Sequence, residues 1–152
     1  MDCVKRKAYA KINLGLDVLR RRPDGYHEVR MVMQTGDITD LLTFRRTDRP
    51  GILLRTDKEE LPSGKDNLIY RAAEAVFREQ TQCGAIPRGQ GVEIILEKRI
   101  PIAAGMAGGS ADAAAVFHGL NELFGPGMSL SDMQRMGVRL GPDIPYCLMG
   151  GT

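Results

Sequence analysis

The sequence predicts an α+β fold, in which strands and helices are mixed without a regular alternation. The first observation is a hairpin signal, because Pro23-Asp24-Gly25 separates two segments with strand character. Proline presets φ in such a turn and glycine accepts a positive φ. The second observation is that several expected strands precede the first expected helix. A doubly wound parallel sheet needs a regular β-α alternation, so the pattern favours α+β.

Apolar and polar side chains alternate along the first expected strand, residues 10–19. This period of two indicates a strand with one buried apolar face. On that interpretation Ile12 and Leu14 point into the core. Lys11 and Asn13 then lie together on the opposite, polar face.

The remaining expected strands are short and bounded by polar loops, and they cover residues 26–34, 41–45, 52–55 and 92–97. Helical spacing of apolar residues marks residues 67–82 and residues 110–124, and the second of these helices closes at Gly125. A third helix starts at Ser129 or Ser131, because each has an acidic residue or glutamine three positions on, and it ends at Gly141. A rigid turn, residues 142–145, follows.

Composition restricts the class of protein. With 152 residues the chain has the length of about one domain, and 43% hydrophobic with 26% charged residues is typical of a soluble globular protein. The net charge of +2 predicts binding to neither nucleic acid nor membrane. Three separated cysteines without metal-ligand spacing, and the lack of a signal peptide, predict reduced thiols, a cytoplasmic location and no protein-bound metal.

A glycine-rich stretch, AAGMAGGSADAAA at residues 103–115, lies between an expected strand and an expected helix. Backbone amides without Cβ atoms at Gly105, Gly108 and Gly109 can surround an anion at the positive end of a helix dipole. Ser110 either caps that helix or gives its hydroxyl to a phosphate. The Walker loop and the dinucleotide fingerprint both need spacings that are absent here. The alternative is a tight crossover, in which the glycines allow the helix and strand to pack closely.

Two charged residues are candidates for chemistry, each with a structural alternative. Lys11 is either a surface lysine or a cation that neutralises phosphate and keeps a carboxylate ionised. Asp143, between two prolines, serves either the turn or a substrate hydroxyl as general base. Tyr26 and His27 either recognise a planar ring or pack within the hairpin.

Three stretches carry a family resemblance that runs in register from about residue 8 to the last residue: AKINLGLDVLRRRPDGYHEVRMVMQT, EKRIPIAAGMAGGSADAAA and LGPDIPYCLMGGT. Together they resemble the 4-diphosphocytidyl-2-C-methyl-D-erythritol kinases, a family of the GHMP kinase superfamily that acts in the non-mevalonate isoprenoid pathway. The resemblance implies a mixed, mostly antiparallel sheet packed against helices, a fold also found in a ribosomal protein domain. It also implies phosphorylation of the 2-hydroxyl of 4-(cytidine 5'-diphospho)-2-C-methyl-D-erythritol by ATP, with Mg²⁺ carried on the nucleotide.

The resemblance assigns roles by position. Lys11 and Asp143 match the catalytic pair, and Asn13, Tyr26 and His27 match the positions that hold the cytidine diphosphate substrate. The positions that match ATP contacts are Asn67, Lys98, Pro101, Ile102, Ala103, Ala104, Gly105, Met106, Ala107, Gly108, Gly109, Ser110 and Ala111.

Members of that family have nearly twice this length, so we expect residues 1–152 to form the N-terminal, ATP-binding domain without the C-terminal GHMP domain. A chain of this kind is expected to be weakly active or inactive, and to dimerise through the face that the second domain would cover. Two other readings stay open at this point. One is another GHMP small-molecule kinase, and the other is a non-catalytic nucleotide-binding or interaction domain, because fold does not imply function.

Overall fold

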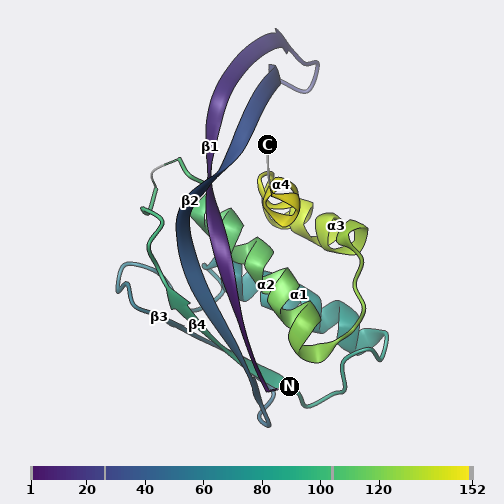
Figure 1. Cartoon of the computed structure of the whole chain (residues 1–152). Coiled ribbons are helices and arrows are strands. Elements are labelled where there is room, and N and C mark those ends of the chain that lie inside the picture. Colours follow the sequence, from purple (N-terminus) through teal and green to yellow (C-terminus); the bar gives the residue numbers. More distant parts are fainter. Residues whose placement is uncertain (1, 26, 104, 151–152) are drawn as a thin grey trace.

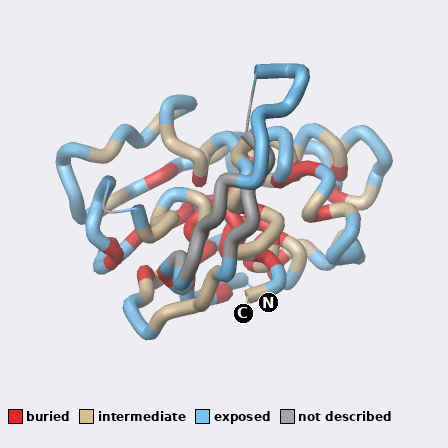
Figure 2. Tube along the Cα trace, turned by 90° about the horizontal axis from the view of Figure 1, so that it is seen from above, coloured by how far each residue is buried: buried red, intermediate tan, exposed pale blue. Residues whose placement is uncertain are grey.

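A computed structural model of the chain describes residues 2–25, 27–103 and 105–150, with side chains for all of these except residue 13, residues 15–18 and residues 27–31. In this part of the chain a four-stranded sheet forms one layer, and four helices cover one face of it (Figure 1). Buried residues concentrate between the two layers (Figure 2). The α+β class expected from the sequence is therefore confirmed.

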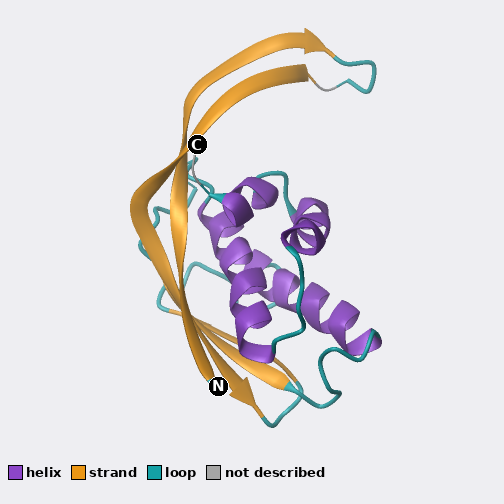
Figure 3. Ribbon diagram, turned by 45° about the vertical axis from the view of Figure 1, so that its right-hand side comes forward, coloured by secondary structure: helices purple, strands orange, loops and turns teal. Residues whose placement is uncertain are grey.

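The first two strands, β1 (Cys3–Arg21) and β2 (His27–Thr47), form one long antiparallel hairpin. Its far end extends beyond the helices and bends toward the side of the sheet on which they lie (Figure 3). The separate strands expected at residues 26–34 and 41–45 are thus one strand. Pairing continues through the segment between them across a register shift. Tyr9 pairs with Thr39 and Lys11 with Thr35, so four residues along β2 oppose two residues along β1. Such a bulge accommodates extra residues without ending the ladder.

The expectation that Ile12 and Leu14 face the core is wrong. Their exposed fractions are 39% and 58%, whereas Ala8, Ala10 and Lys11 are buried at 2%, 1% and 5%. Opposite the irregularity at residues 9–11, two consecutive residues of β1, Ala10 and Lys11, are buried. The change of register therefore accompanies a buried lysine and an exposed Ile12 and Leu14.

The other strands complete a mixed sheet. Strand β3 (Gly51–Thr56) leads into helix α1 (Leu68–Gln82), which returns to strand β4 (Gly91–Glu97). Strand β4 pairs antiparallel with β2 and parallel with β3, and the order is β1-β2-β4-β3. The mixed, mostly antiparallel sheet implied by the resemblance is confirmed.

Helix α2 (Gly108–Phe124) lies against the sheet as the central helix of the second layer. It begins two residues before the expected start at Ser110, and no side chain caps it, so Ser110 is not its cap. Gly119 lies against the sheet, where a Cβ atom would overlap the ring of Phe44. The helix ends at Gly125, as expected, with a left-handed φ of 66°.

Two shorter helices close the layer. Helix α3 (Leu130–Leu140) is capped by Ser129, whose hydroxyl accepts from the Asp132 amide while the Asp132 carboxylate accepts from the Ser129 amide. This reciprocal capping box decides between the two serines that the sequence left open. Helix α4 (Ile144–Met149) begins directly after Asp143, so the second half of the expected turn is the first turn of a helix.

Candidate active site

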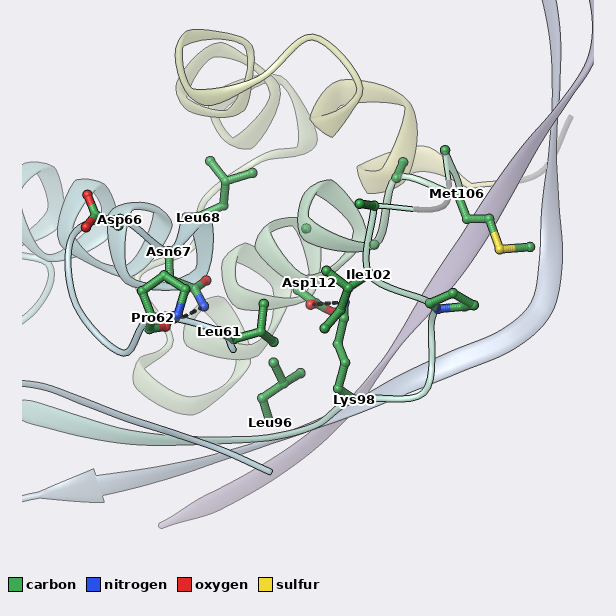
Figure 4. Close-up of a pocket in the computed structure, with 16 residues that line it drawn as sticks. Leu61, Pro62, Asp66, Asn67, Leu68, Leu96, Lys98, Ile102, Met106 and Asp112 are labelled. Carbon is green, nitrogen blue, oxygen red and sulfur yellow. Dashed lines mark hydrogen bonds and ion pairs between the residues drawn. The ribbon is translucent and has the colours of Figure 1, made fainter. Parts of the chain in front are cut away.

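A cavity of about 350 Å³ lies where the glycine-rich stretch meets the N-terminus of α2 and the start of α1 (Figure 4). This volume is in the range of small-molecule sites. Ten of the residues expected to contact ATP line it: Asn67, Lys98, Pro101, Ile102, Ala103, Gly105, Met106, Ala107, Gly108 and Gly109. Ser110 and Ala111 do not line it, and Ala104 lies outside the described residues.

The loop that forms one wall of the cavity has an unusual backbone. Ala103 and Ala107 have φ values of 59° and 54°, and Gly105 has a φ of 73°. Left-handed conformations are uncommon for residues with a Cβ atom and persist where the surrounding structure enforces them. The first intrahelical hydrogen bond of α2 runs from the Ala111 amide to the Ala107 carbonyl at 2.8 Å. Amides before it have no partner inside the helix, an arrangement suited to an anion.

The glycines of this loop are needed for different reasons, close packing at one position and backbone conformation at another. A Cβ at Gly108 would lie 2.8 Å from the Lys98 Nζ and 3.1 Å from Ile100 Cγ2, so this position needs a close approach of backbone to side chain. A Cβ at Gly109 would make an ordinary contact with Leu68 at 3.5 Å. Gly105 is in open space but has a positive φ. The need for glycine at position 108 is thus explained by tight packing, the alternative to phosphate binding considered for this loop.

Below the loop, a buried ion cluster holds Lys98. Its Nζ donates to Asp40 Oδ2 at 2.7 Å and to Asp112 Oδ2 at 2.9 Å, and all three side chains are at most 5% exposed. Asp40 Oδ1 also accepts from the amides of Arg99 and Ile100 at 2.6 and 2.8 Å. The cluster therefore ties β2, the end of β4 and the first turns of α2 together beneath the loop.

The two carboxyl groups of the cluster differ in protonation. Burial raises the pKa of Asp112 to about 8, helped by its hydrogen bond to Asp40 and opposed by the charge of Lys98. Burial also acts to raise the pKa of Asp40, but hydrogen bonds from Asp112, Lys98 and two backbone amides outweigh it and hold that pKa below the usual value. Burial acts to lower the pKa of Lys98, yet Asp112 and Asp40 keep it above the usual value. Asp40 is therefore the anion that pairs with Lys98.

Lys11 and Asp143 meet at another side of the loop. Lys11 Nζ lies 3.7 Å from Asp143 Oδ1, and the Lys11 amide donates to the carbonyl of Met106 in the loop at 3.0 Å. The lysine side chain is 6% exposed and the aspartate side chain 37% exposed. The surface-lysine reading of Lys11 is therefore wrong. Asp143 occupies the N-cap position of α4, but its side chain makes no capping hydrogen bond.

The expected substrate-binding residues cannot be placed in the same way. Tyr26 lies outside the described residues, as do the side chains of Asn13 and His27. Sequence reasoning missed Asp40 and Asp112. The available signal was an acidic residue in an otherwise apolar setting, which is clearest in the run of alanines around Asp112.

Two features do not occur in the described part of the chain: a cluster of metal-ligating side chains and a helix that could span a membrane. No three or more His, Cys, Asp or Glu side chains there gather so that they could hold a metal ion. No helix there combines the length and apolar character needed to cross a membrane.

Comparisons with known proteins identify the family. A family model, "GHMP kinases N terminal domain", matches residues 67–151. The 4-diphosphocytidyl-2-C-methyl-D-erythritol kinase of Lachnoclostridium phytofermentans is 51% identical over 152 residues, 100% of this chain and 50% of that protein. A crystal structure of 4-(cytidine 5'-diphospho)-2C-methyl-D-erythritol kinase matches with a TM-score of 0.79 and 37% identity, over 96% of this chain and 49% of that one. A homoserine kinase from Cytophaga hutchinsonii, at 19% identity and a TM-score of 0.68 over 97% of this chain and 42% of its own, shows the fold alone.

The fold, the loop and the family model define the class: the chain belongs to the GHMP kinases. Within that family, the relative at 51% identity and the structure at 37% identity are both named as kinases of the cytidine diphosphate derivative of methylerythritol. The chain spans about half the length of the curated relatives it matches.

Proposed function

We propose that this chain is the ATP-binding, N-terminal domain of a kinase that phosphorylates the 2-hydroxyl of 4-(cytidine 5'-diphospho)-2-C-methyl-D-erythritol. The observation that carries the proposal is the Lys11–Asp143 pair, which the Met106 carbonyl links to the glycine-rich loop. A phosphoryl acceptor site and a phosphate-binding loop must adjoin for transfer between them. The substrate follows from the names of the relatives.

In this proposal the loop and the first amides of α2 hold the phosphates of ATP, and Asn67 and Lys98 contact the nucleotide. The cavity fits this use, because its wall presents backbone amides and a glycine packed directly on a cation. Mg²⁺ bound to the nucleotide would neutralise part of the phosphate charge.

Asp143 accepts the proton from the substrate 2-hydroxyl as that oxygen attacks the γ-phosphorus, while the bond from the γ-phosphorus to the β,γ-bridging oxygen breaks. The products are a phosphate monoester and ADP, and the proton leaves through Asp143 to solvent. Lys11 lies beside Asp143 and offsets charge that builds up on the transferred group. Asn13, Tyr26 and His27 hold the cytidine diphosphate end, with Tyr26 against the cytosine ring.

A substrate panel tests this function. ADP release by the 152-residue chain is measured with ATP and Mg²⁺, with and without the cytidine diphosphate substrate, and with mevalonate or homoserine in its place. We expect weak release that depends on the cytidine diphosphate substrate. Release that occurs with mevalonate or homoserine alone would refute the substrate and point to another GHMP kinase. Tight ATP binding without release for any acceptor would favour a non-catalytic nucleotide-binding domain.

A further inference from the structure

The Asp40–Lys98–Asp112 cluster contains an atom that the proposed function leaves unexplained. Asp112 is 2% exposed, and its Oδ1 finds no hydrogen-bond donor among the described residues. Its other oxygen accepts from Lys98. Asp112 lines the cavity and is drawn beside Lys98 in Figure 4. A buried carboxylate oxygen without a donor costs free energy, so this environment favours the protonated form of the Asp112 carboxyl group.

We propose that Asp112 is a positioning residue that works as an uncharged carboxylic acid, holding Lys98 toward the nucleotide cavity without placing a net negative charge beneath the phosphates. This inference rests on the proposed use of the cavity for ATP. Asp112 and Asp40 both contact the Lys98 Nζ, at 2.9 and 2.7 Å, so two buried carboxyl groups meet at one cation, and a proton on one of them removes their mutual repulsion. The protonated group is Asp112, because Asp40 already accepts from two backbone amides and from Lys98.

The charges of the cluster then cancel. With Asp40 ionised, Lys98 protonated and Asp112 neutral, the net charge beneath Gly108 is zero. Lysine has three N–H donors, and two of them are used within the cluster, which leaves one for a ligand in the cavity. Ionisation of Asp112 would add one negative charge in a poorly solvated position directly below the phosphate loop. Repulsion of the triphosphate would follow, and low local dielectric would strengthen it.

The titratable groups near Asp112 do not themselves explain a change of ATP affinity between pH 7.5 and 9.5. Facing it are Asp40 from β2, Lys98 from the end of β4 and Cys147 from α4. Burial raises the pKa of the Cys147 thiol to about 11, so that thiol stays neutral through pH 9. Lys11 of β1 is paired with Asp143 before α4. Phosphate groups titrate near pH 6, so ATP keeps its charge between pH 7.5 and 9.5.

The test is the dissociation constant of ATP with Mg²⁺, measured by calorimetry at several pH values from 7.5 to 9.5. We expect the constant of the wild-type chain to rise about tenfold across this range as Asp112 loses its proton. In Asp112→Asn the side-chain amide has the same shape and no charge, so the constant should stay flat. Adenosine, which has no phosphate, should bind the wild-type chain without this pH dependence. Asp66→Asn is the matched control, because it removes an exposed carboxylate at the same cavity and should keep the rise.

The outcomes separate the inference from the function on which it rests. If ATP binds and the wild-type and Asp112→Asn constants change with pH in the same way, the positioning role is overturned while the ATP site stands. If ATP does not bind at pH 7.5, both are overturned. Should Asp112→Asn fail to fold, infrared spectra of the wild-type chain replace it. A protonated carboxyl band that is present at pH 6.5 and lost by pH 9.5 supports the inference, and no such band at pH 6.5 overturns it.

Discussion

Two lysine–aspartate groups contact the glycine-rich loop, and they differ in the carboxylates rather than in the lysines. Lys98 and Lys11 have nearly equal side-chain exposure, 5% and 6%. The partners of Lys98 are 0% and 3% exposed and lie 2.7 and 2.9 Å away. The partner of Lys11, Asp143, is 37% exposed and lies 3.7 Å away, which is longer than a hydrogen bond.

This difference separates a structural from a chemical use of the same residue types. In the closed cluster, Lys98 and two backbone amides occupy the oxygens of Asp40, so that carboxylate has no accessible lone pair for a substrate. At the open pair, Asp143 reaches solvent, where a substrate hydroxyl could meet it, and the buried Lys11 amine lies beside it. The closed cluster packs beneath the loop, and in the proposed function the open pair is the place for proton transfer.

The largest expected effect is on catalysis at the open pair. Asp143→Asn removes the proposed proton acceptor with little change of shape and should lower substrate-dependent ADP release by about 10²–10⁴-fold. The free energy of unfolding should change by less than about 1 kcal/mol, because the pair is long and its carboxylate is partly solvated. Product formation and urea unfolding measure the two effects. A variant whose rate is within threefold of the wild-type rate would mean that Asp143 has only a structural role in the turn before α4.

The second effect should fall on stability at the closed cluster. Lys98→Met leaves Asp40 as a buried anion without its cation and should cost about 3–5 kcal/mol of the free energy of unfolding. Lys11→Met is the matched control, and it should cost less because Asp143 can be solvated. Urea denaturation of both variants makes the comparison. Equal losses would mean that the exposure of the carboxylate does not distinguish the two groups.

A third prediction concerns pH. The folded-state pKa of Asp112, about 8, lies above the ordinary value of 3.8, so between these values the folded chain binds a proton that the unfolded chain has lost. The stability from this proton is complete below pH 4 and is lost as the pH rises toward 8. Between pH 5 and 8 the loss should reach up to about 4 kcal/mol, at about 1.4 kcal/mol per pH unit. Unfolding of wild type and Asp112→Asn at both pH values should show this slope only in the wild type. The same pH dependence of unfolding in wild type and Asp112→Asn would mean that other titrating groups cause it.

The smallest effect tests how closely the loop lies on Lys98. Gly108→Ala places a Cβ 2.8 Å from the lysine nitrogen, which two carboxyl groups hold, and should cost about 1–3 kcal/mol. Gly109→Ala meets only Leu68, at 3.5 Å, and should be neutral or stabilise the helix by up to about 1 kcal/mol. Thermal unfolding of the two variants measures the difference. If Gly108→Ala were as stable as Gly109→Ala, the amine would be free to move away from the loop.

Elements whose signals lie within a few residues could be predicted from the sequence. Helix α3 followed from the capping signals at Ser129 and Ser131, of which the structure uses Ser129, and α2 ended at Gly125, where glycine accepts the left-handed φ. Strand β4 followed from its alternation. The start of α2 was missed because Ala107, a residue that rarely adopts a positive φ, ends the loop before it.

The first strand shows where this reasoning fails. Alternation predicted that Ile12 and Leu14 were buried, but the bulge on β2 changes which face of β1 meets the helices. A bulge depends on the pairing of two strands, so no pattern within β1 alone reports it. The same displacement buries Lys11, which local polarity had placed on an exposed face.

By itself, the sequence determined the α+β class, the strand–loop–helix order around the glycines, and Lys11 and Asp143 as candidates for chemistry. Tertiary structure decided that these two residues, near opposite ends of the chain, form a pair beside the loop. It also decided that Asp40 and Asp112 enclose Lys98. The physical reason is range: periodicity, caps and turns act over a few residues, whereas the burial of a charge depends on elements that meet only when the chain has folded.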